Sequence, residues 1–525
     1  MDTHGIFDHL KGGWKRYVAL FVFNFIAGTL IYLVLISNQL TNPYDGLWHN
    51  SYYGKWSWIL RIGRWAWIFI NKLRLGLSPE PITSLTSIAI FALGNTAILS
   101  IFDVRGVIGA FAGCLMIANT AVCVSLSYRY MSPTFALGYC TSTLAVWVLL
   151  KGHERSLRGR SLISLVFVVI SLGLYQADIG CTCLIILAYL VCLLTKEHDA
   201  KKSFSFAIQG AMLIIAGCAI YYIIWRCLLK LTHTAAASYK GANAVSVYAI
   251  LKNLPSQILY AYKAFYYYFL TKDFIKHNVY QRFPLFHVVL LLLLSSIILN
   301  VIRSKEAPKW RIVVCLLLIF LFPLATGFSL LLASESRLMI QMTMPFAILV
   351  PVCLCIFCNQ VSRTELSFNW RSCLCYAVVG IILYGNVLMV GVDQHVMLEG
   401  REKTFRLIDR IVTELDDQGL STKDKPLLFI GSPADNQFFA KDPLWAKANS
   451  YAQYGKFSSA DNTMLYSYAA LMEALGYNIP TYRNIKLYGE IRTNKDIKAM
   501  PAYPESGYIL EQKDKIIIKV ANSND

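Results

Sequence analysis

The 525-residue chain is too apolar to be a soluble globular protein: hydrophobic residues make up 56%, charged residues only 15%, and the mean hydropathy is +0.48. Soluble domains carry about a quarter charged residues. The net charge is +18, but 17 of the 49 basic and 18 of the 31 acidic residues lie from Asp393 onward, which leaves 32 basic and 13 acidic residues before it. A basic excess confined to connections between apolar helices predicts contact with a lipid bilayer and excludes nucleic acid as a partner.

The apolar runs predict a polytopic α-helical membrane protein with about eleven transmembrane helices, because a helix needs about 20 apolar residues to cross the hydrocarbon core. A few runs are shorter, which helix tilt or local thinning of the bilayer accommodates. The expected spans cover approximately residues 17–36, 82–102, 107–126, 134–150, 161–176, 178–195, 204–229, 285–302, 312–332, 341–358 and 373–392.

Basic residues predict the direction of these helices across the membrane. If the N-terminus is cytoplasmic, five basic connections share the inner side, as the positive-inside rule requires. They are Lys11–Arg16, Lys151–Arg160, Lys196–Lys202, Arg303–Arg311 and Arg363–Arg371. The short connection Asp103–Arg105 falls on that side too, where we interpret it as a structural turn pair.

Three long segments then lie outside the cytoplasm, namely loop 38–81, loop 231–284 and the tail 393–525. The tail begins with an amphipathic stretch over 399–415. A strand-like run at Pro426–Gly431 and a hairpin-like pattern around Gln512–Asp514 follow. We therefore expect a transmembrane domain over residues 1–392 and a small extracytoplasmic α/β domain over residues 393–525.

The first outer loop brings a carboxylate and cations to the boundary between membrane and water. Asp45 follows the first span within an Asn-Pro-Tyr-Asp-Gly turn sequence. If residues 55–74 form one helix, Arg61, Arg64 and Lys72 share a face at ~100° per residue. Such a stripe suits a ligand with a lipid tail, a phosphate and a polar head. The alternative is an ordinary interfacial helix whose arginines bind phospholipid headgroups.

Further polar residues occur in short connections on the same predicted side. Charged side chains exposed to lipid are costly, so they pair with one another or line a cavity. The three connections are Tyr128-Arg129-Tyr130, Tyr175-Gln176-Ala177-Asp178 and Ser334-Glu335-Ser336-Arg337. Each alone fits an ion pair within a loop, whereas their shared side favours a common cavity.

Several kinds of chemistry have no motif in this chain. The histidines form no H-E-x-x-H pattern, and neither a G-x-S-x-G elbow nor a nucleotide-phosphate loop is present. All 14 cysteines lie between Cys114 and Cys375, in or beside apolar runs, where we interpret them as packing residues. We expect neither a metal ion nor a cofactor.

Four short segments, in this order, carry a family resemblance. They are YDGLW with GRW (44–48 and 63–65), SLGLYQADIG (171–180), MPAYPESGYI (500–509) and IIIKV (516–520). Over nearly its whole length the chain resembles the bacterial membrane glucosyltransferases of the GT-C class that modify O-antigen and other surface polysaccharides (glucosyltransferase family II type). Many GT-C enzymes carry paired acidic residues in the first outer loop, whereas Asp45 stands alone, which argues against a metal ion there.

This resemblance implies a polyprenyl-phosphate-linked sugar donor, with glucose as the expected sugar, and a lipid-linked or cell-surface polysaccharide as acceptor. Transfer would occur on the outer face of the bacterial inner (plasma) membrane, alongside a flippase and a donor-synthesising glycosyltransferase.

The resemblance and the charge pattern together suggest roles for individual residues. Asp45 is the candidate general base of an inverting transfer, because an acceptor hydroxyl must lose a proton. Arg61, Arg64 and Arg129 are candidate ligands of the donor phosphate. The residues expected around the sugar and acceptor are Trp65, Tyr175, Gln176, Asp178, Glu335 and Arg337.

Two other functions remain open at this stage. The first is a flippase or transporter of lipid-linked sugars, although such proteins often contain inverted repeats and helices broken at the midplane, and no repeat is visible here. The second is a polysaccharide polymerase or ligase, whose donor would be a diphosphate-linked chain.

Overall fold

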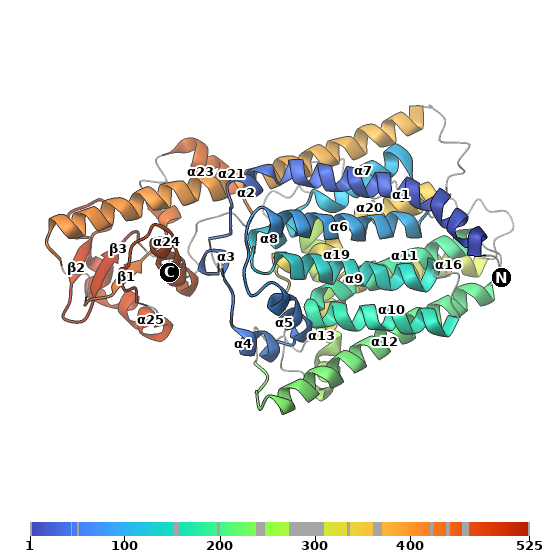
Figure 1. Cartoon of the computed structure of the whole chain (residues 1–525), viewed down its shortest axis with the longest axis horizontal. Helices are drawn as coiled ribbons and strands as arrows, with labels where there is room; N and C mark the ends of the chain where they lie inside the picture. The colour runs from blue at the N-terminus through green and yellow to red at the C-terminus, as the bar shows by residue number, and fades with distance from the viewer. Residues whose placement is uncertain are drawn as a thin grey trace.

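The structure is a computed structural model. It describes the chain except residues 1–2, 44, 50–51, 152–156, 197–199, 238–246, 272–308, 333–336, 361–369, 421–423, 437–441, 454–460, 483 and 523–525. The first part is a bundle of helices, and the tail packs at one end of it (Figure 1).

The helices of the first part follow one another with short connections. Their bounds are α1 Thr3–Ile31, α2 Leu33–Ser37, α3 Asp45–Trp48, α4 Trp56–Arg61, α5 Trp65–Leu73, α6 Ile82–Ile101, α7 Gly106–Ile117, α8 Thr120–Ser127, α9 Ser132–Lys151, α10 Leu157–Leu174, η1 Gln176–Asp178, α11 Ile179–Lys196, α12 Ala200–Leu231, α13 Val247–Leu270, α16 Lys309–Phe320, α17 Phe322–Thr326, α18 Phe328–Leu331, η2 Ile340–Met342, α19 Met344–Ala347, α20 Leu349–Gln360 and α21 Trp370–Asp417.

Within the described residues, five helices are long and apolar enough to cross a membrane, or six if the bent pair α7–α8 is one span. Shorter apolar helices cover Tyr17–Ile31, Gly159–Leu174, Trp310–Thr326 and Met344–Asn359, where four more spans were expected. The expected span 285–302 lies outside the described residues. Several apolar helices therefore fit a membrane protein, while the number eleven remains a prediction.

The expected span 107–126 is broken rather than continuous, with a bend of 50° between α7 and α8. Asn119 explains the break, since its side chain accepts a hydrogen bond from the Val122 N–H and caps α8. Tyr32 donates its hydroxyl to the carbonyl oxygen of Ile117 at 2.8 Å. Backbone groups released at the break are thus satisfied by side chains, as an apolar surrounding requires.

Small and polar residues hold the other helices together, as is usual where no water separates them. The Tyr139 hydroxyl donates to Asn95 at 2.7 Å, which links α9 to α6. Ser132 and Ser87 form a second link between the same helices at 2.8 Å. A Cβ on Gly94 would lie 2.7 Å from the Tyr139 ring, so this crossing needs a glycine.

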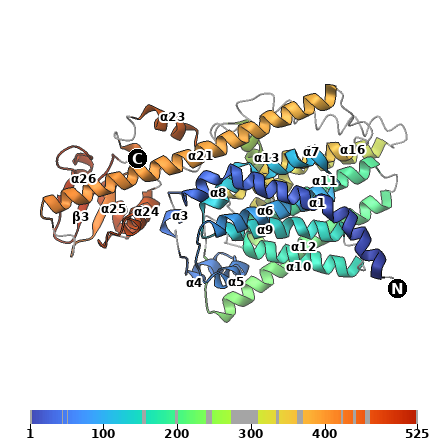
Figure 2. The same ribbon diagram turned by 45° about the horizontal axis from the view of Figure 1, so that its top comes forward.

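Helix α21 joins the two parts of the chain. Its 48 residues extend for about 72 Å, along the bundle and then out beside the tail (Figures 1 and 2). Gln394 donates to the Ile31 carbonyl oxygen at 2.9 Å and accepts from the Leu35 N–H at 3.0 Å. The expected boundary at 392/393 therefore lies inside a helix that is anchored to the first span.

The tail contains a three-stranded sheet in the order β1-β3-β2. Strand β1 (Leu427–Ile430) pairs parallel with β3 (Ile516–Lys519), and β2 (Ile509–Glu511) pairs antiparallel with β3. Strand β1 lies within the predicted run Pro426–Gly431, and β2 and β3 flank the predicted hairpin turn at Gln512–Asp514. The tail also contains η3 Pro433–Asp435, α23 Pro443–Tyr451, α24 Asp461–Ala474, α25 Ile485–Thr493 and α26 Lys495–Ala499.

Both faces of the sheet are covered, which explains the uninterrupted apolar run of β3. Ile516 and Ile518 pack with the far part of α21 on one face. Ile517 packs on the other face, together with Leu428 of β1.

The elements around the first outer loop gather at one end of the bundle. In Figure 1, α3, α4, α5 and α8 lie at the end next to the tail, and the N-terminus lies at the opposite end. The predicted turn pair lies away from that end, between α6 and α7, where Arg105 and Asp103 form an ion pair at 2.5 Å.

Candidate active site

Residues 55–74 do not form one helix, and the expectation of a single helix is wrong. Helix α4 ends at Arg61 and α5 begins at Trp65, because Gly63 between them has a φ of 80°. This left-handed conformation favours glycine. A Cβ on Gly63 would also collide with the hydroxyl of Tyr221.

Two side chains from other helices hold this corner. Gln176 donates its amide to the Ile62 carbonyl oxygen at 3.0 Å and to the Tyr221 hydroxyl at 2.9 Å. Tyr221 in turn donates to the Gly63 carbonyl oxygen at 3.0 Å. Gln176, predicted in the sugar or acceptor site, thus contacts the backbone that positions Arg64.

The corner separates the predicted stripe of cations. Arg61 donates its Nε–H to the Ala235 carbonyl oxygen at 3.2 Å, so it points to the chain after α12. Arg64 instead approaches the Met131 sulfur, with its Nη1 at 3.9 Å. Of these two predicted phosphate ligands, Arg64 lines a cavity that Arg61 does not.

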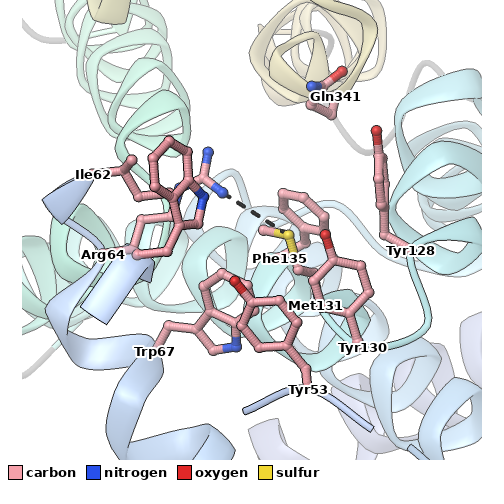
Figure 3. A pocket seen from close by; sticks show the side chains of 10 residues that line it. Tyr53, Ile62, Arg64, Trp67, Tyr128, Tyr130, Met131, Phe135 and Gln341 are labelled. Atoms are coloured by element: carbon pink, nitrogen blue, oxygen red, sulfur yellow. Dashed lines mark hydrogen bonds between the residues drawn. The ribbon is translucent and has the colours of Figure 1, made fainter. Parts of the chain in front are cut away.

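That cavity has a volume of about 60 Å³ and is walled mainly by aromatic rings (Figure 3). Arg64 is the one charged residue among the described residues that line it. The other lining residues are Tyr53, Trp58, Ile62, Trp67, Tyr128, Tyr130, Met131, Phe135 and Gln341. The volume suffices for about two water molecules, so a sugar ring enters only if side chains move.

One wall of the cavity is a stack of rings that extends to α3. Tyr53 stacks on Trp67 with centroids 5.2 Å apart and on Tyr130 at 4.8 Å. The His49 ring meets Tyr53 edge-on at 4.6 Å. Burial, with a smaller effect of Lys55, lowers the pKa of His49 to about 3. His49 is therefore a neutral part of this wall at physiological pH.

Arg64 is half-buried and has few partners for a cation. Its guanidinium carbon lies 4.8 Å from the centroid of the Tyr175 ring, a cation–π contact. Its Nε is buried and has no hydrogen-bond partner among the described residues. A guanidinium with donors to spare, facing a cavity, is suited to bind a phosphate.

Asp178 lies near Arg64 but does not touch it. The two groups interact electrostatically without forming an ion pair or a hydrogen bond within the described part of the chain. Asp178 is 3% exposed. Its carboxylate packs against Gly138, where an added Cβ would lie 2.5 Å from the Asp178 Oδ2. Asp178 thus leaves the hydrogen-bond donors of Arg64 available.

Arg129 occupies a different environment from that expected of a phosphate ligand. Its Nε lies 3.4 Å from Oε1 of Glu80, and the two side chains are 5% and 2% exposed. It also donates to the Gln39 carbonyl oxygen. Burial lowers the pKa of Arg129 and raises that of Glu80. This geometry indicates that Arg129, between Tyr128 and Tyr130 in the sequence, forms a buried structural pair with Glu80.

The remaining predicted residues do not form one cluster: Tyr175 contacts Arg64, whereas Trp65 packs elsewhere. Trp65 packs against α10, where a Cβ on Gly173 would lie 2.7 Å from its ring. Tyr175 is buried against Phe135, with ring centroids 4.7 Å apart. Arg337 is exposed, and Glu335 lies outside the described residues.

Asp45 is the first residue of α3, and its side chain is not among those described. The segment before it is held from two sides. Asn42 donates to the Ser127 carbonyl oxygen at 3.0 Å, and Ser467 of α24 donates to the Pro43 carbonyl oxygen at 2.5 Å. Asp45 thus lies between the tail and the ring stack, four residues before His49.

Sequence reasoning missed most of the aromatic cavity. It did not single out Tyr53, Trp58, Trp67, Phe135 or Met131 as lining residues. The signal available was the density of aromatic residues in the first outer loop, which fits an interfacial belt equally well. The described residues contain no group of three or more side chains that could hold a metal ion.

Comparison with known proteins gives one match. A model of the family described as "Glucosyl transferase GtrII" matches residues 48–357, which is more than half of the chain. No curated protein and no solved structure matches. Every residue that lines the aromatic cavity falls within the matched range, whereas Asp45 and the tail lie outside it. The chain therefore belongs to the GtrII glucosyl transferase family and is a glycosyltransferase.

Proposed function

We propose that the protein transfers glucose from a polyprenyl phosphate to a hydroxyl group of a lipid-linked or cell-surface polysaccharide, on the extracytoplasmic face of the membrane. The observation that carries this proposal is the environment of Arg64. Its guanidinium lines an aromatic cavity and forms no ion pair with any described carboxylate. A sugar phosphate ester needs such a cation, because negative charge develops on the phosphate as it leaves.

The surroundings of the cavity suit a donor with a long lipid tail. Phe69, Leu73 and Leu75, in and just after α5, are 64%, 83% and 75% exposed. Apolar side chains exposed beside cationic ones are typical of a segment that lies in the membrane interface. The lipid tail can therefore remain in the bilayer while the phosphate reaches Arg64.

The rings of the cavity supply a binding surface for the hexose. Tyr53, Trp67 and Phe135 offer apolar faces, on which the C–H faces of a sugar ring can pack. Met131 and Gln341 have unbranched side chains that can rotate to enlarge the cavity, since methionine in particular adapts its shape easily.

Asp45 is the proposed general base. It lies four residues before His49, about 6 Å along a helix, and the His49 ring packs on the cavity wall. In the reaction, the acceptor oxygen attacks the anomeric carbon while the bond from this carbon to the phosphate oxygen breaks. The electron pair leaves on the phosphate beside Arg64, and the hydroxyl proton passes to Asp45. Attack opposite the leaving group inverts the anomeric carbon.

The test is transfer by the purified full chain in lipid nanodiscs, supplied with either polyprenyl-monophosphate glucose or a polyprenyl-diphosphate sugar. We expect transfer only from the monophosphate, and its loss in Asp45→Asn. The control Asp103→Asn alters a carboxylate outside the site and should retain transfer. Transfer from the diphosphate alone would indicate a polymerase or ligase, and near-normal turnover of Asp45→Asn would remove Asp45 from the mechanism.

A further inference from the structure

A second and larger cleft lies in the tail, at the carboxyl ends of the parallel strands β1 and β3. Its volume is about 570 Å³, within the range typical of small-ligand sites. Its walls are Asp435 and Asn436 after β1, Ala521 and Asn522 after β3, and residues 498–503 with Glu505. Ligands of open α/β sheets commonly bind at this edge, because the chain diverges where parallel strands end.

Buried polar side chains hold the walls of this tail cleft in place. Asn436 is 2% exposed and donates to the carbonyl oxygens of Tyr503 and Val520 at 2.8 and 2.5 Å. Lys519 is 3% exposed and donates to the carbonyl oxygens of Lys498 and Met500 at 2.8 and 2.6 Å. Three separate segments are thus cross-linked around one opening, so the cleft is formed before any ligand binds.

The chemistry of the tail cleft favours a neutral, hydroxyl-rich ligand. Its charged lining groups are two carboxylates, Asp435 and Glu505, and one amine, Lys498, which gives no cationic excess for a phosphate or a nucleotide. Carboxylates, amides and backbone carbonyls accept hydrogen bonds from hydroxyl groups, and the amine donates to them. Pro501 and Tyr503 add apolar surface on which a sugar ring can pack.

The tail cleft is connected to the segment that precedes Asp45. Tyr468 of α24 donates its hydroxyl to the carbonyl oxygen of Gly431, directly after β1, at 3.2 Å. The adjacent Ser467 donates to Pro43. Helix α24 lies between the strands and α3 in both views (Figures 1 and 2). One turn of helix therefore links the edge of the cleft to the proposed general base.

We infer that the tail cleft binds the acceptor glycan, holding a neutral saccharide segment of the polymer while a nearby hydroxyl group reaches the site at Arg64. This inference rests on the proposed function. It assigns acceptor affinity to the tail and donor chemistry to the bundle, so changes in the cleft alter the KM for the acceptor and leave donor binding unchanged.

The experiment uses the purified full chain in nanodiscs and short oligosaccharides released by mild acid from the surface polysaccharide of cells that lack this protein. Binding is measured by saturation-transfer NMR and by titration calorimetry. Two variants alter the tail cleft: Ala502→Trp fills it, and Asp435→Asn with Glu505→Gln replaces both carboxylates by amides of the same shape. Glu511→Gln, on exposed β2 outside the cleft, is the matched control.

We expect both cleft variants to weaken oligosaccharide binding and to raise the acceptor KM by about tenfold or more, equivalent to the loss of one good hydrogen bond or more. The donor KM and the thermal unfolding midpoint should stay unchanged, and Glu511→Gln should behave as wild type. Normal binding by both cleft variants, or transfer by a wild-type protein that binds no oligosaccharide, would overturn the inference but not the proposed function. Oligosaccharide binding without transfer from any donor would instead refute the proposed function and leave the cleft as a saccharide site.

Discussion

Replacing Arg64 with Gln removes the one cation among the described residues that line the aromatic cavity. The fold should tolerate the change, because the side chain contributes a contact with the Met131 sulfur at 3.9 Å and a cation–π contact with Tyr175 at 4.8 Å. Together these contribute about 1–2 kcal/mol. The chemical step should be affected far more, since a donor aimed at developing charge is worth about 2.7–4 kcal/mol, or 100- to 1,000-fold in kcat.

Arg64→Lys and Arg61→Gln separate charge from geometry and position. Lysine keeps the positive charge but loses the planar fork that binds phosphate through two hydrogen bonds, so an intermediate loss is expected. Arg61 lies on the same corner and bonds the Ala235 carbonyl oxygen instead of facing the cavity, so Arg61→Gln should retain activity within a few-fold of wild type.

The assay is the initial rate of radiolabelled glucose transfer from polyprenyl-monophosphate glucose, with kcat and KM measured for the donor and the thermal midpoint measured for each variant. A kcat for Arg64→Gln within threefold of wild type, in a stably folded protein, would refute the assignment of Arg64 to the phosphate. An equal loss of kcat in Arg61→Gln would instead indicate that Arg61 and Arg64 act together on the phosphate, as the single-helix prediction implied.

Two further outcomes follow from the geometry of the site. Gly63→Ala should lower both activity and the thermal midpoint, because its Cβ would collide with the Tyr221 hydroxyl. The control Gly476→Ala, at φ 82° with no atom within 4 Å of the added carbon, should lower the free energy of unfolding by only about 1–2 kcal/mol. Equal effects of the two substitutions would contradict a specific role for the corner. The pKa of His49 is about 3 in the folded state, whereas a histidine in the unfolded chain has a pKa of about 6.5. Between these two pH values the unfolded chain binds a proton at His49 and the folded chain does not. The free energy of unfolding should therefore fall as the pH drops from about 6.5 to about 3. His49→Gln should flatten this part of the midpoint-versus-pH curve, and an unchanged slope would show that other groups set it.

Local pattern in the sequence was sufficient for much of the architecture. Runs of apolar residues predicted the positions of the long apolar helices of the bundle, since a helix in an apolar medium needs such a run in any arrangement. The strands of the tail were predictable for a similar reason, as IIIKV and the run before Gly431 are both apolar and bounded by turn residues. The family resemblance, carried by short motifs in a fixed order, agrees with the matched family.

Roles that depend on a partner distant in the chain were not predictable in this way. Arg129 looked like Arg64 in sequence, yet it is paired with Glu80, 49 positions earlier. A helix over 55–74 was reasonable from composition, yet Gln176 and Tyr221 hold Gly63 in a conformation that ends it.

The sequence by itself thus predicted a chain of apolar helices with a short mixed sheet in its tail, and the resemblance predicted the matched family, because hydropathy and short motifs are local properties. Only the tertiary structure decided which arginine lines a cavity and which carboxylate is paired. Those outcomes depend on which distant side chains fill the space around each residue, and that information is spread over the whole chain.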